Sequence, residues 1–324
     1  MGLAVSRQGA NLSAGAFVPQ IYSAKMQAKF YAASVVPAIA NHDWEGDIAN
    51  YGDKVIIRKI PTITVFDHVV NADLPIQDVS DESITLIIDK AKGYNFNVTY
   101  VDEYQSDIAL IEKLTEDASM QMKVAVDSNC FYGTFGGAAA ANQGATAGAK
   151  SGAYNLGTEA APVTLTGANI LQTLTALAGV LDEQNIPESE RALVIDPVTR
   201  QLLMQSNLAQ AQFMGDSQSM VRNGKIGAID RFTVYVSNNL PRTNTGQAYW
   251  TSGDGSQIAT AAAGTTNRRR VLMACHKSAI SFASNMTKLE TVRNPNDFGD
   301  FVRGVNIYGF KVTKPEGMAV AIVQ

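Results

Sequence analysis

The sequence has few residues of the types that bind metals, form disulfides or carry out acid–base chemistry. Its 324 residues include 2 Cys and 3 His. Cys130 and Cys275 lie among apolar residues and far apart in the chain, so their spacing gives neither a disulfide framework nor a metal-ligand motif. We expect both thiols to be free and buried, in a protein synthesised in a reducing cytoplasm.

Charge is also scarce. Charged residues make up 17% of the chain, which is low and fits a protein that covers much of its surface with partners. The formal net charge is −4, so the chain as a whole has no net attraction to nucleic-acid phosphates or anionic lipids. The one dense basic run, Arg268–Arg270, is predicted to be a solvated strand flank and not a phosphate site.

Long apolar runs are missing as well. The first residues, Met1–Arg7, lack a basic start followed by a continuous apolar core, and no run approaches the length that crosses a membrane. We therefore expect no signal peptide and no membrane partner.

Residues that could act in catalysis are scattered. His42, His68 and His276 occupy separate segments, without His-x-x-x-His or Cys-x-x-Cys spacing. A nucleophilic triad could be drawn from Ser278 or Ser281, His276 and an aspartate, but the chain has no Gly-x-Ser-x-Gly elbow. We predict no catalytic residues and no enzyme activity; a monomeric α/β enzyme with an unrecognised site is the alternative from a different class.

The sequence does not indicate a ligand-binding loop. The Gly/Ala-rich residues 133–162 contain no Gly-x-Gly-x-x-Gly, and their composition indicates a domain junction or mobile loop. The acidic residues between 67 and 82 do not have calcium-loop spacing, which favours a solvated or intersubunit salt-bridging face. We therefore predict no cofactor and no metal site.

The first 90 residues contain two segments that lack a core of their own. Residues 1–50 have sparse apolar side chains, which indicates an arm that leans on another surface, with a short helix around 23–33. Strand-forming residues at 55–60 and 84–88 then flank a long charged tip, which predicts an extended hairpin that projects from the body. Such a hairpin gains stability when it lies against a neighbour, so it suggests oligomerisation.

A strand and the longest helix of the chain follow. Residues 94–100 alternate large and polar side chains, which places Tyr94, Phe96, Val98 and Tyr100 on one face. Apolar residues then recur every three or four positions after a capping box formed by Asp102 and Gln105. This predicts a helix over 103–130 that spans on the order of 40 Å.

The second half of the chain alternates helix and strand, which predicts an α/β unit with its own core. Its expected elements are a helix capped by Thr166 and closed by Pro187, a buried strand at 192–195, a helix opened by Asp196–Pro197, a strand at 229–236, a polar insertion over 242–267 and a strand at 271–283.

The last 35 residues are expected to form strand, turn and strand. Turns are predicted at 297–300 and 303–304, and strands at 305–313 and 318–323. We expect these C-terminal strands to pair with the strand at 94–100.

The order of these elements resembles the major capsid proteins of tailed bacteriophages, whose shell fold is shared with encapsulins. The similar stretches are Tyr51–Val55, Ser83–Asp102, Ile229–Pro241 and Arg293–Glu316, which includes Phe298-Gly299-Asp300. The resemblance implies an α+β fold with an N-terminal arm (1–50), an extended β-hairpin loop (51–92), a peripheral domain (93–162 and 284–324) with a spine helix over 103–130, and an α/β axial domain (163–283).

The same resemblance implies a function. The chain would be a major capsid protein in the head of the virion, where it self-assembles into pentamers and hexamers of an icosahedral shell that encloses phage dsDNA. An encapsulin-like nanocompartment shell is the alternative. Because only about 50 residues precede the hairpin, the resemblance implies a separate scaffolding protein. A portal and possibly a decoration protein would be further partners.

Overall fold

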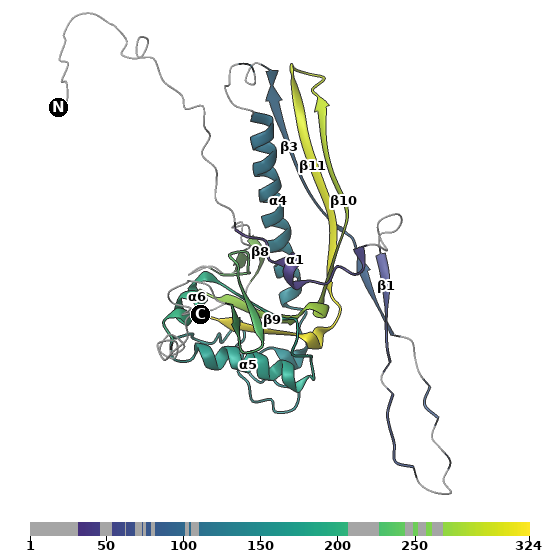
Figure 1. Cartoon of the computed structure of the whole chain (residues 1–324), viewed down its shortest axis with the longest axis vertical. Helices are drawn as coiled ribbons and strands as arrows, with labels where there is room; N and C mark the ends of the chain where they lie inside the picture. Colours follow the sequence, from purple (N-terminus) through teal and green to yellow (C-terminus); the bar gives the residue numbers. More distant parts are fainter. Residues whose placement is uncertain are drawn as a thin grey trace, which may run out of the picture.

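The computed structural model describes residues 32–45, 54–61, 63–68, 73, 76–78, 82–100, 104, 110–206, 227–243, 249–251, 257–260 and 268–324. These form a compact α/β unit, an elongated helix-and-sheet unit that rises from it, and a hairpin that projects from the side (Figure 1). The mixed helix and sheet composition confirms the α+β class. Within the described part of the chain, no helix is long and apolar enough to cross a membrane.

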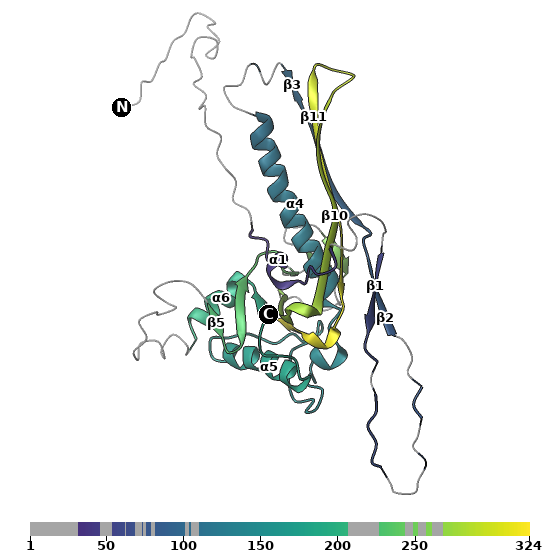
Figure 2. The same ribbon diagram turned by 45° about the vertical axis from the view of Figure 1, so that its right-hand side comes forward.

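The projecting hairpin is built from β1 (Lys54–Lys59) and β2 (Glu82–Ile87). They pair antiparallel from Lys54 opposite Ile87 to Lys59 opposite Glu82, which confirms the predicted hairpin stem. Leu86 is buried at the base, where it packs near Ile88 and Ala283. Beyond the stem the two limbs run away from the body (Figures 1 and 2).

The elongated unit is a sheet of long strands with one helix beside it. In the described residues, β3 (Lys90–Thr99), β10 (Ile280–Arg293) and β11 (Gly299–Val312) form an antiparallel sheet in the order β10-β11-β3. The helix α4 (Leu110–Phe135) packs against β3 and β11. Because Val302 lies opposite Phe96, the predicted pairing between 94–100 and a C-terminal strand is confirmed for β11.

A turn predicted inside β11 is wrong. Arg303 and Gly304 continue the strand, and Gly304 lies opposite Tyr94. A Cβ at Gly304 would lie 2.6 Å from the Tyr94 ring, so glycine at this position lets the ring cross the strand. The residue type therefore serves close packing here and not a reversal of the chain.

The long helix continues five residues past its predicted end at 130. Cys130 and Phe131 are fully buried, so this last part of α4 is anchored in the core. Gly133 is tolerated inside the helix because the Phe310 ring lies against it, where a Cβ would approach to 2.3 Å. The predicted capping box, Asp102 and Gln105, lies outside the described residues.

The α/β unit contains a mixed sheet. Its described strands lie in the order β12-β9-β4-β6-β5, and β4 and β6 are parallel while the other pairs are antiparallel. The strands are β4 (Arg191–Ile195), β5 (Ala228–Ile229), β6 (Phe232–Val236), β9 (Arg270–His276) and β12 (Met318–Val323).

Both faces of this sheet are covered. One face packs on α5 (Ile170–Glu183), with Leu193 and Leu272 buried among the helix side chains. The alternate residues, such as Val194 and Met273, pack with the end of α4 and with α1 (Val36–Ile39). The period-two alternation of strand side chains thus divides the sheet between two cores.

The predicted partner of the last strand is wrong. Instead of joining β3, β12 pairs with β9, with Met318 opposite Cys275. The β12 sequence, Met-Ala-Val-Ala-Ile-Val, has apolar side chains on both faces. Such a strand is stable only in a sheet that is covered on both sides, and the α/β unit provides one.

Two segments that the sequence predicts as single strands each form two strands with a break between them. At 228–236 the chain reverses through Asp230, which has a positive φ of 53°, so β5 and β6 form a short hairpin. At 271–283 a 3-10 turn over Lys277–Ala279 separates β9 from β10, which belong to different sheets. Apolar character continues through both breaks, and a pattern of hydrophobicity therefore does not locate them.

Helix starts were predicted with mixed success. The helix α6 (Pro197–Met204) has Asp196 as its N-cap and Pro197 at its first position, as predicted. The helix α5 begins at Ile170 and not directly after Thr166, whose carbonyl accepts hydrogen bonds from Asn169 and Ile170 N–H. The short helix expected around 23–33 falls on residues of which nearly all lie outside the described part.

The Gly/Ala-rich residues 133–162 pack against the α/β unit. Within them η1 (Ala140–Asn142) places the Asn142 side chain so that its amide donates to the carbonyls of Glu316, at 2.7 Å, and Met318, at 3.0 Å. Ala147 and Leu156 are fully buried beside α5. Small residues are needed here because the segment packs closely against β12.

Within the polar insertion, β7 (Tyr249–Thr251) and β8 (Gln257–Thr260) form a small hairpin.

Candidate assembly surfaces

The projecting hairpin exposes large apolar side chains. Ile60, Val65 and Ile76 are 96%, 92% and 93% exposed, and Ile56 and Ile63 are also well exposed. Several large apolar side chains exposed on one projecting element indicate an interaction site. The sequence pattern predicts a charged tip, and the structure shows that the tip is apolar as well; Ile63 and Val65 alternate with threonines in the sequence.

The two limbs of the hairpin are tied together beyond the stem. The side-chain oxygen of Gln77 accepts a hydrogen bond from the Thr64 N–H at 3.0 Å. Asp67, Asp73 and Asp78 accompany the apolar residues, so the hairpin is both acidic and apolar. Across the described residues, no group of three or more His, Cys, Asp or Glu could hold a metal ion.

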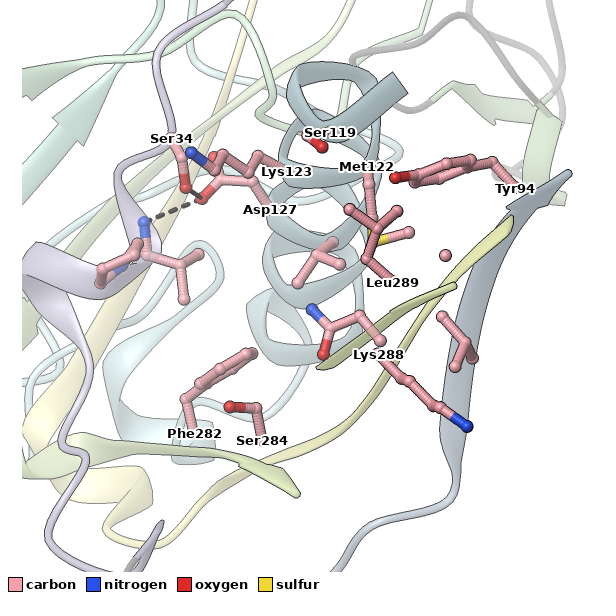
Figure 3. Close-up of a pocket in the computed structure, with 16 residues that line it drawn as sticks. Ser34, Tyr94, Ser119, Met122, Lys123, Asp127, Phe282, Ser284, Lys288 and Leu289 are labelled. Atoms are coloured by element: carbon pink, nitrogen blue, oxygen red, sulfur yellow. Dashed lines mark hydrogen bonds between the residues drawn. The ribbon is translucent and has the colours of Figure 1, made fainter. Parts of the chain in front are cut away.

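A groove lies between α4 and the strands β10 and β11. It has a volume of about 490 Å³. Figure 3 shows Tyr94, Met122 and Leu289 pointing into the space between the helix and the strands. Phe282 and Val305 add apolar surface, and the remaining lining includes Lys123 and Lys288.

One end of this groove is made by the start of α1 and the residue two positions before it. Ser34, Val36 and Pro37 line it, and Asp127 of α4 binds the first two. The Asp127 carboxylate accepts hydrogen bonds from the Ser34 hydroxyl at 2.9 Å and from the Val36 N–H at 2.9 Å. Figure 3 shows these contacts beside the helix.

A second groove, of about 780 Å³, lies along another side of α4. It runs past Lys92 and Phe96 of β3 and reaches Asn238 and Arg242 of the α/β unit. The long helix is therefore bordered by concave surface on two sides. Pattern analysis of the sequence predicts a helix and a strand but not the space between them.

The far end of the elongated unit carries a third exposed surface. Phe298, between β10 and β11, is 71% exposed. Tyr100 is fixed beside it, because its N–H donates to the Phe298 carbonyl and its hydroxyl donates to Asp300, both at 3.1 Å.

Of the four residues predicted to share one face of β3, Tyr94 and Phe96 stack with ring centroids 6.1 Å apart and Val98 is buried.

Comparison with known proteins identifies what these surfaces belong to. Residues 82–321 match the model of a family described as phage capsid protein. The chain belongs to this family. It is a structural protein, a major capsid protein that assembles with copies of itself in the capsid of the virion. A search of curated proteins found no match.

Solved capsid structures share the fold of this capsid protein. A structure from Mycobacterium phage Che8 is 23% identical, with a TM-score of 0.72 over 95% of this chain and 97% of that chain. The capsid of cyanophage P-SCSP1u is 15% identical, with a TM-score of 0.68 over 95% and 93%. The capsid of Ralstonia phage GP4 is 11% identical, with a TM-score of 0.63 over 98% of each chain. The predicted capsid fold is confirmed.

The capsid protein does not bring its three histidines together. His42 packs edge-on to Phe282, with ring centroids 5.5 Å apart, and lies 3.4 Å from Glu45. His68 lies on the projecting hairpin. His276 lies at the end of β9, where burial lowers its pKa and favours the neutral ring.

Two residues of the catalytic triad considered from the sequence, His276 and Ser278, do contact each other. The Nδ1 atom of His276 lies 2.8 Å from the Ser278 hydroxyl and accepts the Ser278 N–H at 3.2 Å, so the ring caps the turn at Lys277–Ala279. Ser281 lies elsewhere, with its hydroxyl 3.1 Å from that of Thr313. The contact between His276 and Ser278 is thus a local structural cap.

Both cysteines are free and buried, as predicted. Burial raises the pKa of Cys275 to about 12, and it raises the pKa of Cys130 further. Neither thiol forms a thiolate at neutral pH, which leaves both as apolar packing residues.

The prediction for the basic run is wrong at two of its three residues. Arg268 is exposed, but Arg269 and Arg270 are buried. The Arg270 guanidinium lies 3.2 Å from the Asp196 carboxylate, and the Arg269 N–H donates to the Thr243 hydroxyl at 2.9 Å. The run enters β9, an interior strand of the sheet, and the arginines are therefore enclosed by neighbouring strands and loops.

Proposed function

We propose that this capsid protein forms pentamers and hexamers that build an icosahedral head enclosing phage dsDNA. In this assembly the hairpin of residues 51–92 overlies a neighbouring subunit. The observation that carries the proposal is the almost complete exposure of Ile60, Val65 and Ile76 on an element with no core of its own. A net charge of −4 is compatible with a container that does not bind its DNA tightly.

The exposed hairpin favours the assembled state energetically. Full burial of an Ile or Val side chain contributes about 1.5–3 kcal/mol relative to exposure. Three such residues therefore contribute several kcal/mol per subunit, and a closed shell repeats this contact in every subunit. In the isolated chain the same side chains remain in water.

The groove beside α4 matches the hairpin in character. Its walls are apolar at Met122, Val305 and Leu289, and the hairpin supplies isoleucine and valine. Lys123 and Lys288 line it, while the hairpin carries aspartates. Lys288 lies 3.5 Å from Glu290, but an exposed pair of this kind is weak and exchanges partners readily.

Further partners belong to the same proposal. The arm reaches another subunit with the residues before position 32, since residues 33–45 are held on α4 and β10 of this subunit. A separate scaffolding protein, a portal and a decoration protein act with the shell. The subunit is made in the host cytoplasm, and the proposal assigns it no catalytic site, metal or cofactor.

We also propose a division of the chain into domains. It keeps the arm (1–50), the hairpin (51–92), a peripheral domain built on α4 and the β10-β11-β3 sheet, and an axial domain built on the α/β unit. The pairing of β12 with β9 and the packing of residues 133–162 on α5 favour placing both segments in the axial domain.

Acidic substitutions on the hairpin test the proposal. We expect Ile60→Asp combined with Val65→Asp to abolish shell formation while the subunit unfolds at the same denaturant concentration as the wild type, because neither side chain has a folded-state contact to lose. Electron microscopy and sedimentation measure assembly. Thr64→Asp is the matched control, since it adds a charge to the same exposed hairpin without removing apolar surface. Normal shells from the double variant would contradict the proposal.

A further inference from the structure

Asp127 is a carboxylate in the interior of the protein. It lies on α4, its residue is 1% exposed, and it accepts four hydrogen bonds. Three come from the residues at the start of α1, namely the Ser34 hydroxyl and the N–H groups of Val35, at 3.1 Å, and Val36. The fourth comes from the Asn239 side-chain amide at 2.8 Å.

The four donors come from two separate parts of the chain, and the acceptor Asp127 belongs to a third. Asn239 lies in the connection that follows β6 of the α/β unit, and its amide nitrogen also lies 3.4 Å from the Ala33 carbonyl. Residues 33–36 therefore meet α4 and the α/β unit at a single carboxylate. Contacts of this kind, between residues 91 to 112 positions apart, form only in the complete tertiary structure.

Within the described part of the chain, no cation forms an ion pair with Asp127. Burial of a carboxylate is costly unless hydrogen bonds replace its water. At Asp127 most of those bonds come from residues 34–36. If this segment moved away, the carboxylate would lose three donors in an interior position, so the segment and the carboxylate hold each other in place.

The same segment continues into a second set of contacts. The Asn41 N–H donates to the Ile280 carbonyl at 2.8 Å, and the Asn41 carbonyl accepts the Phe282 N–H at 2.9 Å. The Glu45 carboxylate accepts the Ser284 N–H at 3.1 Å. Residues 33–45 are thus fixed to α4 at one end and to β10 at the other, on the two walls of the groove.

We infer that Asp127 is a positioning residue that fixes residues 34–37 as the end wall of the groove beside α4. The groove is complete only while this carboxylate holds the segment. The inference rests on the proposed function, in which the groove receives a neighbouring subunit and residues 1–31 reach another. Asp127 therefore also sets the point from which that arm leaves the body.

Hydrogen–deuterium exchange of the full-length subunit tests the inference directly. We expect Asp127→Ala to speed exchange in a peptide covering 34–37 by about ten-fold or more, because the Val35 and Val36 amides lose their acceptor. A peptide covering 271–275 in β9 should exchange as in the wild type. Glu116→Ala, on the exposed side of the same helix, is the matched control and should change neither peptide.

Two conservative variants separate positioning from general stability. Asp127→Asn keeps one acceptor oxygen for the three arm donors and should restore most of the protection. Ser34→Ala removes one donor on the surface, where it cannot unfold the core, and should speed exchange at 34–37 by about two- to five-fold. The Ser34 variant therefore tests the inference even if Asp127→Ala fails to fold.

Assembly is the second readout. We expect Asp127→Ala to form fewer shells than Glu116→Ala at equal concentration, and Asp127→Asn to form nearly as many as the wild type. Unchanged exchange at 34–37 in both Asp127→Ala and Ser34→Ala would overturn the role of the carboxylate. Faster exchange with normal shells would show that Asp127 fixes the segment and would overturn its contribution to assembly. A wild-type chain that forms no shells would refute the proposed function, while the exchange comparison would still test Asp127.

Discussion

Asp196 shows how one side chain serves two levels of structure. Its carboxylate accepts the N–H groups of Val198 and Thr199 at the start of α6, at 3.2 and 3.3 Å. The same carboxylate pairs with Arg270, which lies 74 positions away. The capping role was predictable because a cap lies next to its helix in the sequence. The ion pair was not, because no local signal identifies a partner in another strand.

We expect Asp196→Ala to lower the free energy of unfolding by about 3 kcal/mol, because it removes a helix cap and leaves the buried Arg270 without its partner. Urea denaturation followed by circular dichroism measures this. Asp89→Ala is the control, since Asp89 forms an exposed pair with Lys90 and its loss should cost less than about 1 kcal/mol. Equal losses in the two variants would show that the Arg270 pair contributes little.

Other residues show which side-chain environments can be predicted from the sequence and which cannot. The buried state of Cys130 and Cys275 was predictable from their apolar neighbours. The burial of Arg269 was not, because three consecutive arginines usually remain in water. Asp127 gave no signal either: in the sequence it is an ordinary acid on a helix, and its role depends on residues 33–36 and 239 folding against it.

Among the elements, those with a strong period were predicted well. The stem of the hairpin, the strand β3 and the helix α4 follow from alternation or helical spacing within a few residues. Boundaries failed where apolar character runs through a break, as between β9 and β10. The partner of β12 failed because pairing is decided by which sheet covers both faces of a strand, and a local pattern does not contain that information.

At this scale we predict that deletion of residues 62–82 leaves the body folded and blocks assembly. The two large cores contain no residue of this segment, so the thermal unfolding transition should remain within a few degrees of the wild type. Calorimetry and electron microscopy check the two parts separately. Loss of the folded body would show that the hairpin is part of the subunit core.

At the scale of the whole molecule, the order of elements carried more information than any motif. Arm, hairpin, strand, long helix, α/β unit and returning strands together resemble tailed-phage capsid proteins, and the match over residues 82–321 confirms the family. The sequence does not predict the two grooves beside α4, because each is formed by segments that are distant in the chain. The surfaces proposed to serve assembly are therefore properties of the folded subunit.

The central claim is that the full chain builds a closed shell. Cryo-electron microscopy of the expressed chain, with a scaffolding protein supplied where needed, tests it most directly. We expect icosahedral particles of pentamers and hexamers in which the hairpin of one subunit lies on the next, and particles from infected cells should contain dsDNA. Particles that hold an enzyme instead would identify a nanocompartment. A persistently monomeric chain that turns over a small molecule would contradict the account.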